Sequence, residues 1–408
     1  MYIYVLYAAV VILSMLIIFH AFVRIKYRFW STQPVFHKYD LNYYLFPPGI
    51  INPNLPEKTR YYRDDITFQA MNELTVTESE DFCRFIRNCY LQKEEIAYTP
   101  TNENIAAYFE GHNNKSYISI KYESEMLHNP KTNEVLERRK IASTMTTRPM
   151  FCELLFKNVS GKDILPFEMN YVDYLCVGQD YRGKGLASDN IYTHEYHVRR
   201  ANKKVTVALF KREDTVMGIV PLCTFDTIGF DMRNWTKLPE LQPNIGKIVR
   251  CDSSNFYLVK DFLIESLGKF DIYLYSSYGN IMELMKTNNI YVYMIIDIQG
   301  VIRSVYFFRD TCTYYDNSTS KLLSLFASVK GKRTSDELFS HGCKLSITKI
   351  VDEYKGYVYF LADDISDNHI IISNLKKKSP VYLQSPNAYF FYNFACKQFQ
   401  PNKVLLIN

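Results

Sequence analysis

The sequence predicts an α+β protein preceded by one transmembrane helix, and three observations lead to this expectation. An apolar run over residues 2–23 is about as long as a bilayer is thick. Beyond it, segments with helical spacing of apolar residues are interleaved with alternating, strand-like segments. The chain has 408 residues, 47% hydrophobic and 22% charged, which is enough for one large domain or two fused ones with buried cores.

The apolar run carries no Asp, Glu, Lys or Arg, and Arg24, Lys26 and Arg28 follow it. A cleaved signal peptide has its positive charge before the apolar run, so this order favours an uncleaved anchor. Because Lys and Arg stay on the cytoplasmic side, we expect a single-pass membrane protein whose main domain is cytosolic. A buried core helix is the alternative, but the run is longer than most core helices.

The remaining elements are predicted in order along the chain. Residues 36–64 are rich in Pro, Asn and Tyr and predict an extended arm. The first half then predicts helices at 77–91 and 100–109, strands at 115–123, 139–156 and 168–177, and a turn and helix over 178–200. The second half predicts helices at 255–270 and 280–286, a hairpin over 290–308 turning near Gly300, and strands at 354–363 and 388–396.

Composition excludes several classes of partner. The net charge of +5 is small and the basic residues are interspersed with acidic ones, so we expect no nucleic-acid partner. The nine cysteines contain no CxxC pair, which argues against both a disulfide framework and a metal site. The segment from His194 to His197 lacks the HExxH spacing of zinc sites, and we interpret it as the surface of a helix.

A glycine-containing turn follows the strand that ends at Val177. Small residues in such a turn let backbone N–H groups approach an anion, and the helix N-terminus adds positive partial charge. The turn fits the R-x-x-G-x-A pattern of the pyrophosphate loop in Gcn5-related acyltransferases (GNAT), and an ordinary strand-to-helix turn is the alternative. Its residues are Arg182, Gly183, Lys184, Gly185, Leu186 and Ala187.

Several blocks together make the sequence resemble the N-myristoyltransferases. "YRFWSTQPV" (27–35), "CYLQKEEIAYTP" (89–100), "DYLCVGQDYRGKGLA" (173–187), "MGIVPLC" (217–223), "FYNFAC" (391–396) and "KVLLIN" (403–408) resemble family segments in order and approximate spacing. The resemblance implies two pseudo-symmetric GNAT-type halves around a saddle-shaped mixed sheet. Together with the apolar run, it divides the chain into an anchor (1–23), an acyl-CoA-binding half (24–240) and a peptide-binding half (241–408).

The resemblance also implies a reaction, the transfer of a myristoyl group from myristoyl-CoA to the N-terminal glycine amine of a protein. The base would be the terminal carboxylate, here of Asn408, although the apolar end of the chain also fits a strand that completes a sheet. The thioester oxygen would be held by the main-chain N–H groups of Tyr174 and Leu175. Acyl-CoA enters as a substrate, and no cofactor or metal is implied.

The binding residues follow from the same resemblance. Phe29 and Trp30 would cover the CoA, with an interfacial aromatic belt beside the anchor as the alternative. The six residues of the glycine turn would hold the pyrophosphate. Glu94, Glu95 and Asp173 would contact the peptide. Asp173 stands where the family has Asn, and the family's Thr on the next strand has only Lys211 or Thr215 as counterparts.

Three functions therefore compete: a membrane-anchored N-myristoyltransferase, an N-acyltransferase with another acyl group, and a non-catalytic membrane or virion protein on the same fold. The intact glycine turn and terminal segment favour the first. Asp173 and the diverged second half favour the others. The 34 tyrosines suggest a large DNA virus as the source, and hence a viral membrane as a location.

Overall fold

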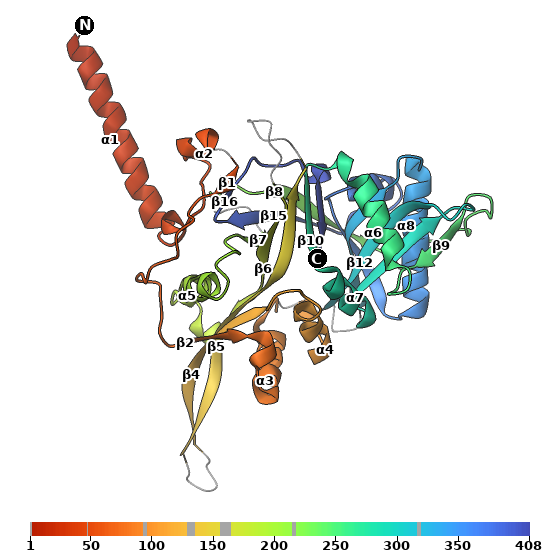
Figure 1. Ribbon diagram of the computed structural model, residues 1–408, viewed down its shortest axis with the longest axis horizontal. Helices are drawn as coiled ribbons and strands as arrows, with labels where there is room; N and C mark the ends of the chain where they lie inside the picture. The colour runs from red at the N-terminus through yellow and green to blue at the C-terminus, as the bar shows by residue number, and fades with distance from the viewer. Residues whose placement is uncertain are drawn as a thin grey trace.

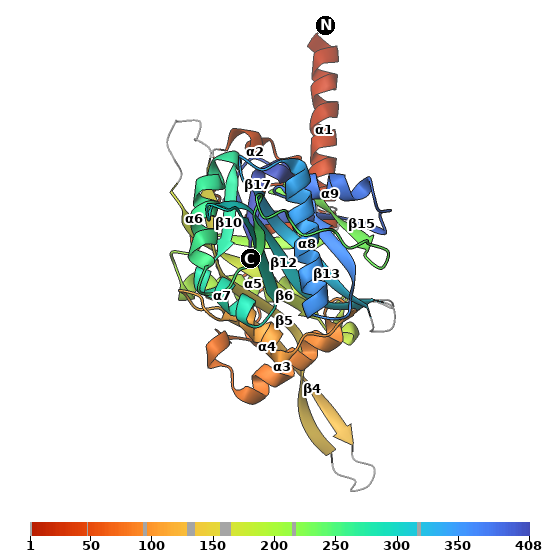
Figure 2. The same ribbon diagram turned by 90° about the vertical axis from the view of Figure 1, so that its right-hand side faces the viewer.

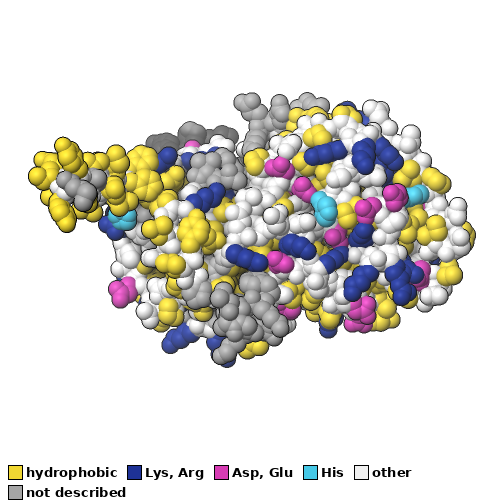
Figure 3. All heavy atoms as spheres, turned by 90° about the horizontal axis from the view of Figure 1, so that it is seen from above, with side chains coloured by type: hydrophobic (Ala, Val, Ile, Leu, Met, Phe, Trp, Pro, Cys, Tyr) yellow, Lys and Arg dark blue, Asp and Glu magenta, His cyan; other side chains and the backbone are white. Residues whose placement is uncertain are grey.

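The computed structural model describes residues 2–46, 48–92, 96–128, 135–155, 165–213, 218–315 and 320–408. Helix α1 (Tyr2–Lys26) projects away from the body of the molecule (Figure 1). It is long and apolar enough to cross a membrane, with a mean hydropathy of 2.5 over an 18-residue window. The exposed side chains of α1 are mostly hydrophobic, whereas the surface of the body carries both basic and acidic side chains (Figure 3).

One large mixed sheet organises the rest of the chain. Among the described residues it has 15 strands, in the order β17-β10-β5-β6-β7-β15-β8-β14-β13-β12-β11-β9, with β2, β3 and β4 attached to this path. The sheet is built from both halves of the sequence, because β15, from the second half, lies between β7 and β8 from the first.

The first half of the chain contributes the following helices and strands to the fold. They are α2 (Leu41–Leu45), β1 (Gly49–Ile50), β2 (Ile66–Ala70), α3 (Val76–Cys89), β3 (Ile96–Tyr98), α4 (Asn102–Ala106), β4 (Tyr117–His128), β5 (Val135–Leu154), β6 (Phe167–Val177), α5 (Leu186–Ala201), β7 (Ala208–Glu213) and β8 (Cys223–Asp231).

The second half adds the strands at both ends of the sheet order, together with helices that flank them. Its elements are β9 (Lys247–Arg250), α6 (Phe256–Ser266), β10 (Ile272–Ser276), α7 (Tyr278–Lys286), β11 (Ile290–Ile296), β12 (Ile302–Tyr315), β13 (Ser320–Lys330), α8 (Asp336–Glu353), β14 (Tyr357–Asp363), α9 (Asn368–Lys376), β15 (Leu383–Tyr392), β16 (Phe394–Ala395) and β17 (Val404–Ile407).

Two βαβ units repeat the same connection. Strand β6 leads through α5 into parallel β7, and β13 leads through α8 into parallel β14. In each unit the first strand also pairs antiparallel with the strand before it, β5 in one and β12 in the other. The chain therefore contains two related halves that share one sheet.

The core lies on both faces of the sheet because successive strand residues point to opposite sides. In β11, Val292 packs with α6 and α7, whereas Tyr291 packs with α8 and α9. Figure 2 shows these helix pairs on either side of the strands. Residues alternate in the same way in β7, where Leu209 belongs to one core cluster and Ala208 to another. This alternation decides which side chains of β6 and β7 share a face.

Most elements predicted from the sequence are confirmed. Helix α3 begins after Thr75, whose side chain accepts a hydrogen bond from the N–H of Glu78 while the Glu78 carboxylate accepts one from the N–H of Thr75. The hairpin of β11 and β12 turns at Gly300, which has φ +79°. The extended arm is wrong in part, because it contains α2 and β1. Helix α8 has no clear apolar stripe to predict it, because Ser340, Gly342 and Ser346 are buried among its apolar residues.

Candidate active site

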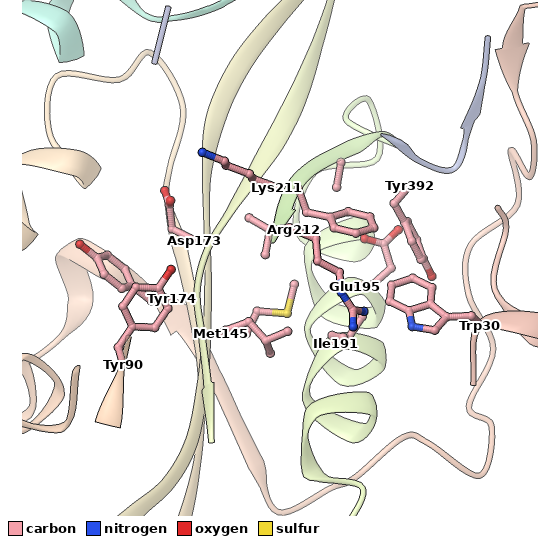
Figure 4. Close-up of a pocket in the computed structure, with 14 residues that line it drawn as sticks. Trp30, Tyr90, Met145, Asp173, Tyr174, Ile191, Glu195, Lys211, Arg212 and Tyr392 are labelled. Atoms are coloured by element: carbon pink, nitrogen blue, oxygen red, sulfur yellow. The ribbon is translucent and has the colours of Figure 1, made fainter. Parts of the chain in front are cut away.

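A gap opens between two parallel strands of the first half. Strands β6 and β7 pair only at Asn170↔Ala208 and Tyr171↔Leu209, and beyond this point no further pairing joins them. A cavity of about 320 Å³ occupies the divergence, lined by both strands, by α5 and by the N-terminal arm (Figure 4). Strands of a parallel pair that separate in this way leave their facing edges available to a ligand.

Aromatic rings form the outer wall of the cavity. Trp30 lines it and stacks on Phe210 at a centroid distance of 5.6 Å, and Phe210 stacks on Phe390 at 5.3 Å. Phe29 is buried behind Trp30, edge-on to it and to Tyr61. Trp30 thus lines the cavity directly, whereas Phe29 contacts the ring of Trp30, and the contact of both residues with CoA stays a prediction.

A carboxyl group on α5 also faces the cavity. Glu195 of α5 lines it, and burial raises the pKa of Glu195 from 4.5 to about 7 despite the opposing effect of Arg199. Its Oε1 lies 3.5 Å from Nη1 of Arg199, one helical turn further on. Beside the aromatic rings the wall therefore carries a carboxyl group that is protonated in part of the chains near neutral pH.

Strand β6 is kinked at Tyr174 and Leu175, the two residues proposed for the thioester oxygen. The register with β5 passes from Thr144↔Cys176 to Thr146↔Asp173, so β6 has one extra residue there. Tyr174 has φ +41°, a conformation that costs a non-glycine residue about 1–3 kcal/mol.

Two hydrogen bonds hold this strained residue. The hydroxyl of Thr144 donates to the main-chain oxygen of Tyr174 at 3.1 Å, and the hydroxyls of Tyr98 and Tyr174 lie 3.0 Å apart. Tyr174 is itself buried among the rings of Phe82 and Tyr90. The surroundings therefore fix the kink, which is the condition under which backbone strain persists.

The glycine turn begins at Arg182, with four residues between it and the end of the kinked strand at Val177. Gly183 has φ +75° and Gly185 has φ +83°, and a Cβ at either position would meet no atom within 4 Å, so their backbone is open to solvent. Gly185 is the N-cap of α5 and provides no side-chain cap. The first N–H groups of this 16-residue helix, beginning at Leu186 and Ala187, are thus without a capping side chain.

Charged side chains around the turn are partly committed to the protein. Arg182 donates to the main-chain oxygens of Val177 and Cys89, at 3.3 Å each. Lys184 is exposed, with Nζ 5.3 Å from the ring of Tyr181. Asp189 in the first turn of α5 would repel an anion, but its Oδ2 accepts a hydrogen bond from Nε of Arg63 at 2.8 Å.

Asp173 precedes the kink and is paired with a buried cation. Nε of Arg148 donates to Oδ2 of Asp173 at 2.6 Å, and Nη1 of Arg148 donates to Oγ of Ser276 at 2.8 Å. Only 1% of Arg148 is exposed, and its guanidinium lies over the rings of Tyr108 and Tyr171. The charge that Asp173 adds to the site is therefore compensated within the protein.

The end of the chain lies close to this ion pair, because Arg309, which holds Asn408, has its guanidinium over the same Tyr108 ring as Arg148. We call this cluster of Arg148, Asp173, Tyr108, Arg309 and Asn408 the chamber. Strand β17 pairs parallel with β10, and Asn408 is 2% exposed. Nη2 of Arg309 donates to the main-chain oxygen of Asn408 at 2.5 Å and to its Oδ1 at 2.9 Å. The segment therefore completes the sheet and buries Asn408, and the role of Asn408 as a base stays a prediction.

Lys211 and Asp363 form a further charged pair on this face. Lys211 Nζ lies 3.6 Å from Oδ2 of Asp363, and Oδ1 of Asp363 accepts a hydrogen bond from Thr227 at 2.5 Å. Thr215, Glu94 and Glu95 lie outside the described residues.

The interpretation of His194 as a surface residue is wrong. It is 1% exposed, and its ring nitrogens each lie 2.8 Å from a hydroxyl, of Ser119 and of Thr147. Burial lowers the pKa of His194 to about 3, so the ring is neutral. No group of three or more His, Cys, Asp or Glu that could hold a metal occurs in the part of the chain that the structure describes.

Sequence reasoning missed the two arginines of the chamber, Arg148 and Arg309. A signal was present, since Arg148 interrupts an apolar strand, where a buried cation needs a partner. Its partner, Asp173, was noticed only as a departure from a family pattern.

Comparisons with known proteins agree on the fold. No family model and no curated protein matches the sequence. Two structures of Saccharomyces cerevisiae N-myristoyltransferase with bound myristoyl-CoA match with TM-scores of 0.65 and 0.66 at 14% identity, covering 92% of this chain and 94% and 90% of theirs. A tandem GNAT protein from the clavulanic acid biosynthesis pathway matches with a TM-score of 0.51 at 9% identity, covering 82% of this chain and 100% of that one. The predicted fold, α+β with a large mixed sheet of the N-myristoyltransferase and GNAT type, is confirmed.

Proposed function

We propose that this protein is an acyl-CoA-dependent N-acyltransferase that transfers a myristoyl or similar long-chain acyl group to the N-terminal glycine amine of a protein. One observation carries the proposal: the fixed kink at Tyr174 and Leu175 borders a cavity between diverging strands and is followed by an uncapped helix N-terminus. The kink, the cavity and the glycine turn follow one another in the same order as the thioester, the pantetheine and the pyrophosphate of an acyl-CoA.

Acyl-CoA binds in the half formed by residues 24–240. The pyrophosphate contacts the backbone N–H groups of the turn from Arg182 to Ala187, where the helix dipole favours an anion. Trp30 closes the cavity over the chain that runs along β6. The peptide approaches from the face that carries Asp173, using residues 241–408 for much of its contact.

The reaction is direct attack of the glycine amine on the thioester carbon. An α-amino group has a pKa of roughly 7.7–8.0 and must lose a proton before it attacks, so a base close to it accelerates the reaction. The terminal carboxylate of Asn408 is that base. The main-chain N–H groups of Tyr174 and Leu175 stabilise the oxyanion, the C–S bond breaks, and CoA leaves as the thiol.

Arg309 pairs with the residue that carries the proposed base. Its guanidinium already pairs with Asn408, so the incoming amine meets a carboxylate that has a resident cation. Likewise Asp173 meets the amine already paired with Arg148. This charge pairing favours a second candidate, in which the same site acylates an amine other than an N-terminal glycine.

Helix α1 anchors the enzyme in this proposal, with residues 2–23 in the membrane and the catalytic body in the cytosol. Long-chain acyl-CoA and acylated proteins both partition to membranes, so an anchor keeps the cavity close to substrate and product. If removal of residues 1–23 left both membrane association of the protein and the location of its product unchanged, the anchor would have no such role.

The test is transfer of label from myristoyl-CoA to Gly-starting peptides by the full chain in detergent, with Ala-starting peptides and acyl-CoAs of other lengths as comparisons. A second chain carries residues appended after Asn408. Transfer that is lost on extension supports the terminal carboxylate as base, whereas transfer that survives removes it from the mechanism. Absence of both transfer and acyl-CoA binding would leave the non-catalytic alternative.

A further inference from the structure

A lysine lies on the acceptor side of the gap between β6 and β7. Lys211 belongs to β7 and lines the cavity together with Asp173, Tyr174 and Leu175 of β6. Among the described residues that line this cavity, Lys211 has the only primary amine, and the other basic residue, Arg212, carries a guanidinium that is not a nucleophile.

The orientation of Lys211 separates it from the aromatic wall. Alternation along β7 puts Lys211 on the face of Leu209, which packs in the same core cluster as Tyr171. Figure 4 shows its side chain extending away from Trp30 and Glu195 and toward Asp173. Lys211 thus lies on the face from which an acceptor amine would approach the kink.

The contacts of the Lys211 amine are loose. Its Nζ is 3.6 Å from Oδ2 of Asp363, beyond hydrogen-bond distance, and 5.3 Å from the ring centre of Phe225. About a third of the side chain is exposed (32%), so solvent screens the ion pair and its contribution is small. A flexible four-carbon stem held by one weak ion pair and one aromatic contact can swing at little cost.

We infer that Lys211 is an internal acyl acceptor: without an external amine, its ε-amine takes the acyl group from bound acyl-CoA and becomes an Nε-acyl-lysine. The inference rests on the proposed function, because it uses the same kink and the same thioester. A lysine amine is an established nucleophile toward carbonyl carbons once it is unprotonated.

The step balances without a further reagent. The Lys211 ammonium loses one proton to Oδ2 of Asp363, which Thr227 holds in place through Oδ1, and the free amine attacks the thioester carbon. The N–C bond forms, the C–S bond breaks, and the second proton of the amine goes to the departing CoA thiolate. The product is an amide, so each chain reacts once and its acceptor side is then occupied by the acylated lysine.

The experiment incubates the full-length chain in detergent with myristoyl-CoA and no peptide. Intact-mass spectrometry, peptide mapping and thiol release follow the reaction, with the denatured chain as control for uncatalysed acylation. We expect about one acyl group per chain on Lys211, about one equivalent of thiol, and a rate that rises with pH because the free amine attacks. K211R keeps the positive charge and abolishes the modification, whereas K203R, at an exposed lysine after α5, leaves it unchanged.

The outcomes separate this inference from the proposed function. Transfer to a Gly-starting peptide with Lys211 unmodified would overturn the inference and leave the proposed function standing. Modification of many lysines at equal rates, in native and denatured chains alike, would also overturn it. Excess Gly-starting peptide should protect Lys211 in proportion to the peptide acylated, and a chain that neither binds acyl-CoA nor releases thiol would refute both proposals.

Discussion

The two βαβ units of this molecule have the same strand–helix–strand connection. They differ in the spacing of their parallel strands and in the start of their helix, the two places where a ligand could bind. In the unit of β6, α5 and β7, the parallel strands pair at two register positions and then part around a cavity. In the unit of β13, α8 and β14, they pair from Lys321↔Tyr357 to Leu325↔Ala362, and Leu323, Leu325 and Phe360 there are fully buried.

The helix starts differ in the same sense. Helix α8 is capped by Ser335, whose side chain accepts a hydrogen bond from the N–H of Leu338, and it carries Asp336 and Glu337 in its first turn. Helix α5 starts from a left-handed glycine without a side-chain cap. A capped, acidic helix start satisfies its own N–H groups and repels anions, whereas an uncapped start needs a ligand or water.

The comparison shows what converts a structural unit into a candidate binding site. Both first strands are irregular where they leave their partner, since the β12–β13 register shifts around Phe326 just as the β5–β6 register shifts at Tyr174. In the second unit the guanidinium carbon of Arg309 lies 4.5 Å from the centre of the Phe326 ring and so covers this irregular position. A kink alone is thus insufficient. Strand separation and an uncapped helix must accompany it.

We call the unit of β6, α5 and β7 the open unit and the unit of β13, α8 and β14 the closed unit. The largest effect should come from the ion pair of Arg148 and Asp173 in the open unit. We expect Arg148→Met to lower the free energy of unfolding by about 3–5 kcal/mol, because it leaves Asp173 partly buried without its cation. Adding Asp173→Asn should restore most of the loss, which chemical denaturation of the single and double variants would measure. In the closed unit, Leu323→Ala should cost about 2–5 kcal/mol through a cavity instead. If Asp173→Asn gave no rescue, charge pairing would not be what holds the open unit.

Elements with a local sequence signal were the easier ones to predict. Hairpin β11–β12 and helix α3 follow from local signals, namely Gly300 at a turn and the capping box of Thr75 and Glu78. The glycine turn was predicted because glycine at a strand-to-helix junction has a direct backbone meaning. Single-residue patterns sufficed wherever the physical cause lies within a few positions of the chain.

The chamber could not be predicted in this way, because its partners are far apart in the sequence. Arg309 meets Asn408 across 99 residues and Lys211 meets Asp363 across 152. The strand order, with β15 and β8 between β7 and β14, places Lys211 near Asp363, and the contact of β17 with β13 places Asn408 near Arg309 of the neighbouring β12. No local pattern encodes that order, so the resemblance to a family supplied Asn408 while the cation beside it went unnoticed.

Stability of the open unit should also depend on pH through Glu195, whereas the corresponding inward positions of α8, such as Phe339 and Cys343, are apolar. Burial raises the pKa of Glu195 from 4.5 to about 7, so the folded chain binds the proton more tightly than the unfolded one. Stability is then highest below about pH 4.5 and falls as pH rises through about 7. Relative to Glu195→Gln, the parent should lose about 2–3 kcal/mol between about pH 5 and 8.

Denaturation of both chains at each pH measures this difference. The neutral His194 contributes an opposite slope at lower pH, but it is common to both chains and cancels. A parent and a Gln variant with parallel curves would show that Glu195 ionises in the folded chain as freely as in the unfolded one.

Transplanting the acidic first turn of α8 into α5 would test the helix starts directly. The double change Leu186→Asp and Ala187→Glu should weaken acyl-CoA binding about 30-fold, or about 2 kcal/mol, because two carboxylates then oppose the bound phosphates. Titration calorimetry with myristoyl-CoA at fixed salt measures the change. The matched control, Asp336→Leu with Glu337→Ala in α8, should leave affinity unchanged. Equal weakening by both pairs would mean that the ligand does not contact the α5 turn.

The smallest effect isolates the kink itself, and the chain provides a matched pair of neighbours for it. Thr144 donates to the main-chain oxygen of Tyr174, whereas the buried Thr146 hydroxyl has no hydrogen-bond partner among the residues that the structure describes. We expect Thr144→Val to cost about 1 kcal/mol of stability and to lower kcat about tenfold with little change in acyl-CoA affinity, since the two N–H groups lose their fixed direction. Thr146→Val should cost nothing or stabilise slightly, because it removes an unsatisfied polar group. Equal kcat in the two variants would mean that the strained backbone at Tyr174 is a feature of folding and takes no part in transfer.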